Sequence, residues 1–172
     1  MFVVVGIMIL ALVFMMIRPL LTPKPKSKTV RTSHETQNQS STEIPFTQEG
    51  YLWFIDSKGD TLKKIELEIA DNDFETQRGL MDRRSMKEDQ GMLFIFDDMS
   101  MRSFWMKNTY IPLDIIFVTD KMEIESIQAN TTPFSQQSVP SNGPAQYVVE
   151  VNAGFSQAYG IGAGTKIFYQ RL

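Results

Sequence analysis

The 172-residue chain contains no cysteine and a single histidine, and both scarcities exclude large classes of chemistry. Without cysteine there is no disulfide, no thiolate nucleophile, no zinc–sulfur site and no lipid-modified cysteine anchor. One histidine rules out a site with two histidine ligands, and this residue, His34, lies in a polar stretch with no second ligand or nucleophile nearby. We therefore predict no metal site and no cofactor.

Charge is missing from the first part of the chain. No charged side chain precedes Arg18, and Met1 to Ile17 is apolar without a break. This length approaches the roughly 20 apolar residues that a transmembrane helix needs. The basic start and small-residue cleavage site of a secretory signal are absent. We predict an uncleaved anchor helix over residues 1–21, with a cleaved signal as the alternative.

Residues 22–44 are predicted to form a disordered linker, because this Thr-, Ser-, Gln-, Lys- and Pro-rich stretch has little apolar surface to bury.

The sequence leaves two orientations of the anchor open. The basic residues after the apolar run place their side in the cytoplasm by the positive-inside rule, whereas a basic leader upstream would reverse this. Our expectation is an extracytoplasmic domain tethered to the membrane by a single helix.

Residues 45–172 are predicted to form one globular domain. They hold 12 basic and 18 acidic side chains, so the domain carries a net charge of about −6, although the whole chain is only −3. No basic cluster and no alternation of aromatic with basic residues is present, so nucleic acid is not an expected partner. The sequence names no oligomeric state.

Short apolar or alternating segments separated by turns dominate this domain. Ile65 to Ile69 alternates strictly, and a turn at Ser57–Asp60 separates it from Tyr51 to Ile55, which predicts a hairpin. Further strands are expected at residues 92–96, 102–107, 113–119, 122–127, 146–152 and 166–169. One short helix is expected over residues 74–81, with an N-cap in Asp71–Asp73 and Gly79 near its end. The fold class is mainly β: a compact antiparallel barrel or rolled sheet of seven to eight short strands.

The segments around Trp105 and Asp114 are the most distinctive. In a strand, Leu113, Ile115 and Phe117 share one face, so Asp114 lies on the other and becomes a carboxylate in an apolar setting if both faces are covered. Glu150 poses the same problem on another strand. The candidate partners of Asp114 are Lys107, Arg78, Asn108 and Asn152. The candidate ligand-binding residues are Trp105, Lys107, Asn108, Asp114, Arg78 and Glu150, and the competing interpretation is a buried hydrogen-bond network that fixes strand register.

Two further chemistries fit parts of the sequence. Asp114 and Glu150 are a possible carboxylate pair for glycoside hydrolysis, which requires the two groups to face one cleft. Met99-Ser100-Met101 places two thioethers in one predicted loop, and thioethers favour Cu(I), although methionine also fills gaps in cores. No catalytic residue is assigned.

Several motifs, in one order over residues 50 to 170, resemble domain-of-unknown-function family 192. They are residues 78–81, 91–96, 104–109, 112–114, 147–151, 153–154 and Gly164. The resemblance implies a bacterial or archaeal protein with a compact, mainly β fold that often follows a signal or anchor. It implies no established reaction. It marks Trp105, Lys107, Asn108 and Asp114 as shared positions, whereas the Met99–Met101 pair is not a family feature.

Three functions follow as hypotheses. The first is a non-enzymatic, membrane-tethered envelope module that binds a partner, a small molecule or a glycan stacked on Trp105 or Tyr110. The second is a hydrolase of envelope or extracellular glycans that uses Asp114 and Glu150. The third is a methionine-based copper carrier.

Overall fold

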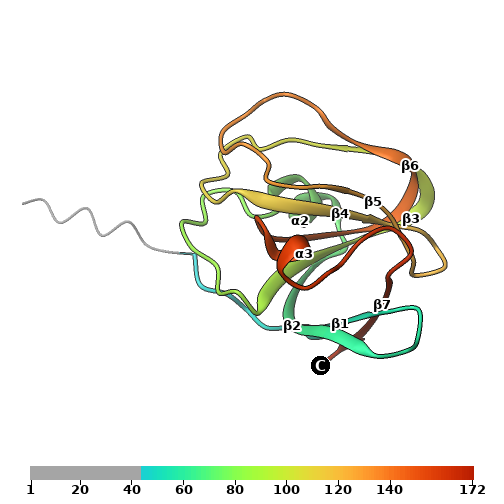
Figure 1. Cartoon of the computed structure of the whole chain (residues 1–172). Coiled ribbons are helices and arrows are strands. Elements are labelled where there is room, and N and C mark those ends of the chain that lie inside the picture. Colours follow the sequence, from blue (N-terminus) through green and yellow to red (C-terminus); the bar gives the residue numbers. More distant parts are fainter. Residues whose placement is uncertain (1–43) are drawn as a thin grey trace, which may run out of the picture. The chain divides into compact units, whose positions relative to one another are not determined.

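Residues 44–172 form a rolled, mainly β domain in the computed structural model (Figure 1). The predicted anchor helix, the linker up to residue 43 and His34 lie outside the described residues. The elements are β1 (Gly50–Ile55), β2 (Thr61–Ala70), α2 (Asp73–Arg78), β3 (Gln90–Phe104), β4 (Leu113–Val118), β5 (Ile124–Gln128), β6 (Val139–Asn152), α3 (Phe155–Ala158) and β7 (Lys166–Arg171). They build one sheet in the order β5-β4-β6-β3-β2-β1-β7. No helix within residues 44–172 is long and apolar enough to cross a bilayer.

The first two strands form the antiparallel hairpin that the sequence predicts. Buried Leu52 of β1 lies opposite buried Ile65 of β2, so the alternating pattern sets the register. Asp56 holds the turn, because its Oδ1 accepts hydrogen bonds from the backbone N–H groups of Lys58 at 2.8 Å and Asp60 at 2.9 Å. Local turn chemistry and strand pattern therefore agree here.

The next pair departs from the predicted antiparallel arrangement, because β2 and β3 run parallel. A parallel neighbour requires a crossover, which α2 and the following loop supply. The helix begins after Asn72, whose Oδ1 accepts a hydrogen bond from the Glu75 N–H at 3.0 Å, and its C-cap is Gly79. The helix is thus predicted correctly in place but is shorter than residues 74–81.

The strands β3 and β6 are long and bent, whereas the sequence predicts short ones. The predicted strands 92–96 and 102–107 are parts of one strand that ends at Phe104, and register shifts interrupt its pairing with β6. The predicted polar loop before residue 146 belongs to β6 from Val139 onward. Pro140 and Pro144 fit there because that half of β6 pairs in a ladder with β3 alone, so one strand edge needs no N–H donor.

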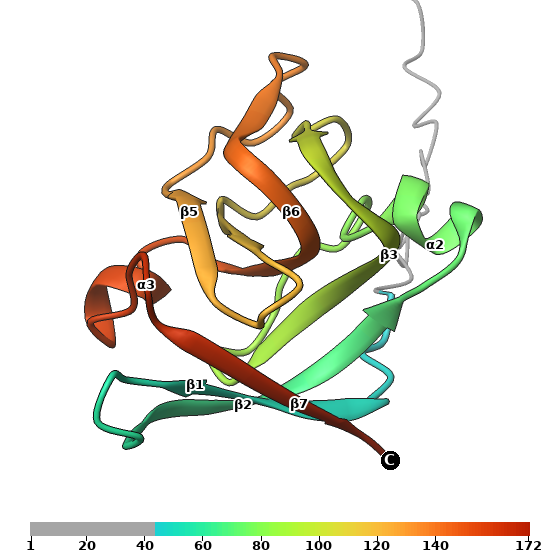
Figure 2. The same ribbon diagram turned by 90° about the vertical axis from the view of Figure 1, so that its right-hand side faces the viewer.

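The rolled sheet buries apolar side chains on both faces. Figure 2 shows β1, β2 and β7 on one side of the roll, β5 and β6 on the other, and β3 between them. The first core fills the roll and includes Leu52, Phe54, Leu67, Leu93, Ile116 and Val149. The second core covers the opposite face of β3, β4 and β6 and includes Phe94, Met106, Leu113, Ile115, Phe117 and Val148. The central strands are therefore enclosed on both sides.

The two ends of the sheet meet at one point. Glu123 and Lys166 form an isolated antiparallel bridge, and the Ile167 N–H donates to the Met122 carbonyl at 2.8 Å. This contact joins the β4–β5 hairpin to β7 and partly closes the barrel. A second short helix, α3, precedes β7 in the glycine-containing stretch where the sequence predicts none.

Candidate functional site

Asp114 is fully buried in β4, a strand whose six residues are all buried. The predicted alternation is confirmed: Ile115 belongs to the second core and Ile116 to the first. Both faces of the strand are covered, so the Asp114 carboxylate needs donors from the protein. Asp114 is therefore a carboxylate in an apolar setting, as expected for a strand that is covered on both faces.

Three backbone N–H groups provide those donors. Oδ1 of Asp114 accepts hydrogen bonds from Asn130 at 2.9 Å and Gly154 at 3.1 Å, and Oδ2 accepts one from Ser156 at 2.9 Å. Gly154 is the N-cap residue of α3 and makes no side-chain cap of its own. Asp114 therefore caps this helix from a neighbouring strand and also fixes the loop at Asn130.

The predicted side-chain partners of Asp114 are wrong. Arg78, Lys107 and Asn108 have exposed side chains that do not bond to it. Asn152 instead donates through Nδ2 to the carbonyls of Met86 at 3.0 Å and Lys87 at 3.1 Å. Backbone N–H groups, not a cation, provide the hydrogen bonds that the buried Asp114 carboxylate needs.

Asp114 and Glu150 do not face one cleft, which contradicts the paired-carboxylate prediction. The pairing of β4 with β6 sets Asp114 opposite Val151 and Ile115 opposite Glu150. Residues that face each other across two strands share a sheet face, and adjacent residues point to opposite faces. Glu150 therefore points toward the second core and Asp114 points away from it. The two carboxyl groups cannot flank the same bond of a substrate.

Glu150 is the unusual titratable group of the second core. Its side chain is only 5% exposed, and its neighbours in register are Met92 of β3 and Ile115 of β4. Burial raises the pKa of Glu150 to about 8, because water cannot solvate the ionised form. Within residues 44–172 no group donates a hydrogen bond to its carboxyl, which is therefore protonated at neutral pH and without a protein partner.

The carboxyl of Glu150 borders a small cavity of about 30 Å³, which we call the Glu150 hollow. Its other walls come from the end of α2 and the turn after it, from β3 and from the loop after β3. They are Thr76, Gln77, Arg78, Gly79, Leu80, Met81, Phe94, Phe104, Trp105 and Thr109. Gly79 has φ +48°, and a Cβ there would lie 3.1 Å from Phe94 Cζ and 3.8 Å from Glu150 Oε2. Glycine therefore keeps this space open and permits the backbone conformation.

A larger surface cavity of about 530 Å³, the Trp105 groove, adjoins the hollow. Its lining residues are Thr76, Gln77, Phe96, Met101, Arg102, Ser103, Phe104, Trp105, Gln136 and Ser138. Four of them, Thr76, Gln77, Phe104 and Trp105, also line the hollow. The groove and the hollow therefore form one continuous candidate site.

Arg102 is held in place at the wall of the groove. Its Nε donates to the Ala145 carbonyl at 2.9 Å, its Nη2 approaches Asp98 Oδ1 at 3.0 Å, and its guanidinium lies 3.9 Å from the Phe96 ring centroid. These contacts use its Nε and Nη2 donors and pair its charge with Asp98. Arg102 therefore contributes shape more than a free positive charge.

The six predicted site residues divide into two groups. Trp105, Arg78 and Glu150 come together at the hollow, and Lys107 joins them indirectly, because its Nζ lies 5.0 Å from the Trp105 ring centroid. Asp114 and Asn108 lie elsewhere. Asn108 adopts a positive φ of 55° in a turn, and its carbonyl accepts a hydrogen bond from the Asp82 N–H at 2.8 Å.

Three residues that line the groove, Gln77, Arg102 and Phe104, were not predicted from the sequence. Arg102 and Phe104 are separated by two positions in a predicted strand, so period-two alternation was a signal that they share a face. The methionine pair, by contrast, is not brought to a common cavity, because Met101 lines the groove and Met99 a different surface hollow near Asp120. The two methionines therefore line different cavities, and binding of Cu(I) by this pair stays a prediction.

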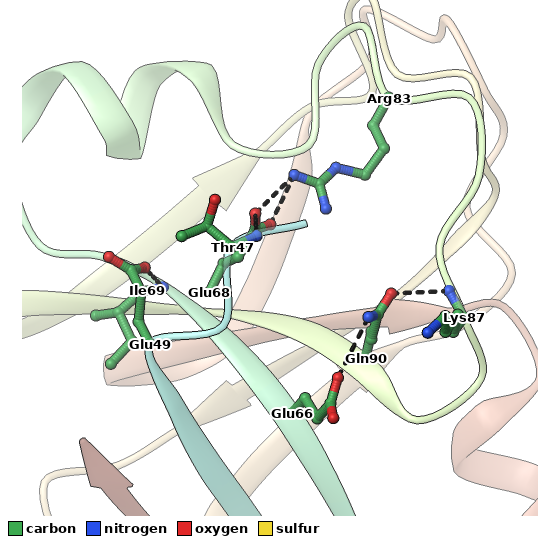
Figure 3. A network of polar contacts seen from close by, with 8 residues as sticks. All are labelled: Thr47, Glu49, Glu66, Glu68, Ile69, Arg83, Lys87 and Gln90. Atoms are coloured by element: carbon green, nitrogen blue, oxygen red, sulfur yellow. Dashed lines mark hydrogen bonds and ion pairs between the residues drawn. The ribbon is translucent and has the colours of Figure 1, made fainter. Parts of the chain in front are cut away.

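A buried ion pair lies outside the groove. Arg83 Nη2 approaches Glu68 Oε2 at 2.7 Å and Oε1 at 2.9 Å, and both side chains are buried (Figure 3). The Thr47 N–H donates to Glu68 Oε1 at 2.8 Å, and the Ile69 N–H donates to Glu49 Oε2 at 2.7 Å. The network fastens the segment before β1 onto β2, which is a structural role.

Comparisons with known proteins agree with this fold. The model of DUF192, a family described as an uncharacterized ACR, matches residues 54–169. A crystal structure of a proposed transcription regulator from Sinorhizobium meliloti 1021 is 35% identical, with a TM-score of 0.68 over 74% of this chain and 97% of that chain. A crystal structure of a protein of unknown function from Novosphingobium aromaticivorans DSM 12444 is 34% identical, with a TM-score of 0.65 over 69% of this chain and 83% of that one. No curated protein matches.

Proposed function

The chain belongs to domain-of-unknown-function family 192, and from this premise we propose that its folded domain is a non-enzymatic binding module whose ligand occupies the Trp105 groove. The observation that carries the proposal is the groove itself, an open cavity of about 530 Å³ with Trp105 44% exposed at its wall. Ligand sites of soluble proteins have volumes of roughly 300–1,000 Å³ and combine aromatic walls with a few polar groups.

The polarity of the groove favours an uncharged, hydroxyl-rich ligand such as a glycan. Phe96, Phe104 and Trp105 offer aromatic surface, on which the apolar face of a sugar ring stacks. The polar lining consists of amide and hydroxyl groups, with Gln77 and Gln136 as the amides, and no acidic residue lines the groove. The one guanidinium, that of Arg102, is already engaged with Asp98. Neutral hydrogen-bonding groups beside aromatic rings are the complement of a sugar.

The membrane enters the proposal through the predicted anchor at residues 1–21. A single helix and a polar linker would hold the binding module near the bilayer, on the extracytoplasmic side. A linker of this length corresponds to about 25 Å as a flexible coil, which would keep the groove within reach of envelope glycans.

No second carboxylate faces Glu150, so a two-carboxylate hydrolytic function has no geometric support within the described domain.

The test uses the full chain in detergent. The chain contains two tryptophans, so a Trp53→Phe background leaves Trp105 as the only tryptophan, whose emission is excited at wavelengths that tyrosine does not absorb. Diacetylchitobiose, cellobiose and maltotriose are the probes, and at least one is expected to change the Trp105 emission saturably. In calorimetry, Trp105→Ala is expected to weaken that binding at least about tenfold, equivalent to the loss of about 1.4 kcal/mol. Trp53→Ala, at a residue of β1 that lines neither the groove nor the hollow, is the matched control and should leave the affinity unchanged.

Two results would overturn the proposal. One is the absence of saturable binding to any of the three glycans by a chain that still unfolds cooperatively. The other is tighter binding of duplex DNA than of any glycan, which would align the chain with the regulator proposed in Sinorhizobium meliloti. The net charge of about −6 over residues 45–172 argues against that second outcome, because non-specific DNA affinity depends on phosphate neutralisation.

A further inference from the structure

The Glu150 hollow and the Trp105 groove share four wall residues, so a ligand in the groove lies directly beside the hollow. The hollow has a volume of about 30 Å³. About 10–15 Å³ of such space is enough for one water molecule, so the hollow accommodates a single small polar group. It is too small for a sugar ring, which must remain in the groove.

Among the described residues that line the hollow, Glu150 has the only buried polar side chain without a hydrogen-bond partner in the protein. Polar groups buried in proteins are nearly always hydrogen-bonded, and an unmet carboxyl costs free energy. Among the hollow's walls the only charged side chain is that of Arg78, which is exposed on α2; Met92 and Ile115, next to Glu150 in the sheet, are apolar. The unmet hydrogen-bonding capacity is therefore directed at whatever enters the hollow.

Gly79 supplies the second, independent observation. Its backbone has φ +48° and ψ −135°, a conformation that only glycine adopts readily. A side chain there would meet the Phe94 ring at 3.1 Å and project toward Glu150 Oε2. A glycine in this conformation and an unpartnered acid therefore border the same small space.

We propose that the Glu150 hollow is an anchoring subsite of the groove, in which the Glu150 carboxyl binds one hydroxyl group that projects from a neutral, polyhydroxylated ligand. A protonated carboxyl donates one hydrogen bond and accepts another, and a hydroxyl group does the same, so the two are complementary. The raised pKa of about 8 keeps the carboxyl in this form at neutral pH. This inference rests on the proposed function of the groove and adds the residue that selects the ligand's functional group.

The experiment compares two substitutions of Glu150 in the full chain. Glu150→Gln keeps a neutral side chain with donor and acceptor and is expected to bind the positive glycan within about threefold of the unsubstituted chain. Glu150→Leu removes both groups and is expected to weaken binding about tenfold or more, since the ligand hydroxyl then enters an apolar space. Glu125→Leu, at a residue that lines neither cavity, is the matched control for the loss of an acid.

Nuclear magnetic resonance of the Glu150 side-chain carboxyl carbon provides the second readout. Its chemical shift is expected to move on addition of the glycan, and also of glycerol as a small hydroxyl probe. The glycan affinity is expected to fall above about pH 8 in the unsubstituted chain and to stay constant in Glu150→Gln.

The two proposals fail differently. Trp105-dependent glycan binding with no change in the Glu150 carbon signal, or with equal affinity in Glu150→Leu, would overturn the subsite and leave the groove standing. A Glu150 signal that responds to glycerol while no glycan binds would overturn the glycan-binding proposal and keep the hydroxyl-binding hollow. The absence of both responses would overturn both.

Discussion

Asp114 and Glu150 lie one register position apart on neighbouring strands and point to opposite faces of the sheet, because Ile115 is the residue opposite Glu150. The fold accommodates these two buried acids in different ways. Asp114 receives three backbone N–H donors, which is the environment of a structural carboxylate. Glu150 receives none from residues 44–172 and borders a cavity. The first acid is hydrogen-bonded within the domain, whereas the second has no hydrogen-bond donor among the described residues.

Asp114→Asn is expected to destabilise the domain by about 3 kcal/mol, because the new amide group turns a donor toward backbone N–H groups that need an acceptor. Urea denaturation followed by tryptophan fluorescence measures this loss. Asp97→Asn, at an exposed position of β3, is the control and should stay within about 0.5 kcal/mol of the unsubstituted chain. Equal stability of the two variants would contradict the capping role of Asp114.

Glu150 makes the free energy of unfolding depend on pH. Burial raises its pKa from an ordinary 4.5 to about 8 in the folded state, so the folded chain retains a proton that the unfolded chain releases. The contribution of Glu150 to the free energy of unfolding is therefore fully present below pH 4.5. It is lost as the pH rises to about 8, by up to ~1.4 kcal/mol per pH unit. Glu150→Gln is expected to flatten that slope in denaturation at a series of pH values, whereas Asp97→Asn should retain it.

Alanine substitutions at three glycines distinguish the cost of backbone strain from the cost of a steric contact. Gly79→Ala is expected to be destabilising, because it combines a positive φ with a contact 3.1 Å from Phe94. Gly154→Ala isolates the strain, since its φ is +83° and nothing lies within 4 Å of the new Cβ, and Gly162→Ala has neither problem. The strain costs about 1–3 kcal/mol. Thermal unfolding should rank Gly162→Ala as most stable and Gly79→Ala as least, and any other order would argue against the close contact at Phe94.

The buried pair of Arg83 and Glu68 gives a double-substitution test. Arg83→Met alone is expected to cost about 3–5 kcal/mol, because it leaves the Glu68 carboxylate buried and uncompensated. Adding Glu68→Leu should recover much of that loss. Arg171→Met, which breaks the exposed pair of Arg171 with Asp71, is the control and should cost less than about 1 kcal/mol. Additive losses in the double variant would show that the buried pair is not coupled.

The fold was predictable wherever local chemistry decides it. The strict alternation of Ile65 to Ile69, the turn at Ser57–Asp60 and the N-cap within Asp71–Asp73 each have a local sequence signal, and all three are found. The length of β3 carried no such signal, because Asp97 and Asp98 look like a loop but lie in an exposed, irregular part of a strand. The parallel pairing of β2 with β3 is a long-range choice, which no local pattern encodes.

The candidate site shows the same limit. Period-two alternation correctly placed Asp114 and Ile115 on opposite faces of the strand. Only the register between β4 and β6 reveals that Glu150 lies on the same face as Ile115. The donors to Asp114 are backbone amides, and every residue carries one, so the sequence cannot mark them. Trp105, Arg78 and Glu150 meet because the end of the crossover helix lies beside β3 and β6 at the hollow, and that placement depends on the whole domain.

The pairing of β1 with β7 has a consequence for synthesis of the chain. Gly50 lies opposite Arg171 and Ile55 opposite Lys166, so strands from the two ends of the domain are hydrogen-bonded neighbours. On the ribosome, β1 emerges early and forms its hairpin with β2, while its other edge waits for a partner that is translated last. Such long-range pairing slows folding and leaves an edge open to foreign strands. A nascent chain halted before Lys166 would therefore present a sheet in which one edge of β1 has no partner strand.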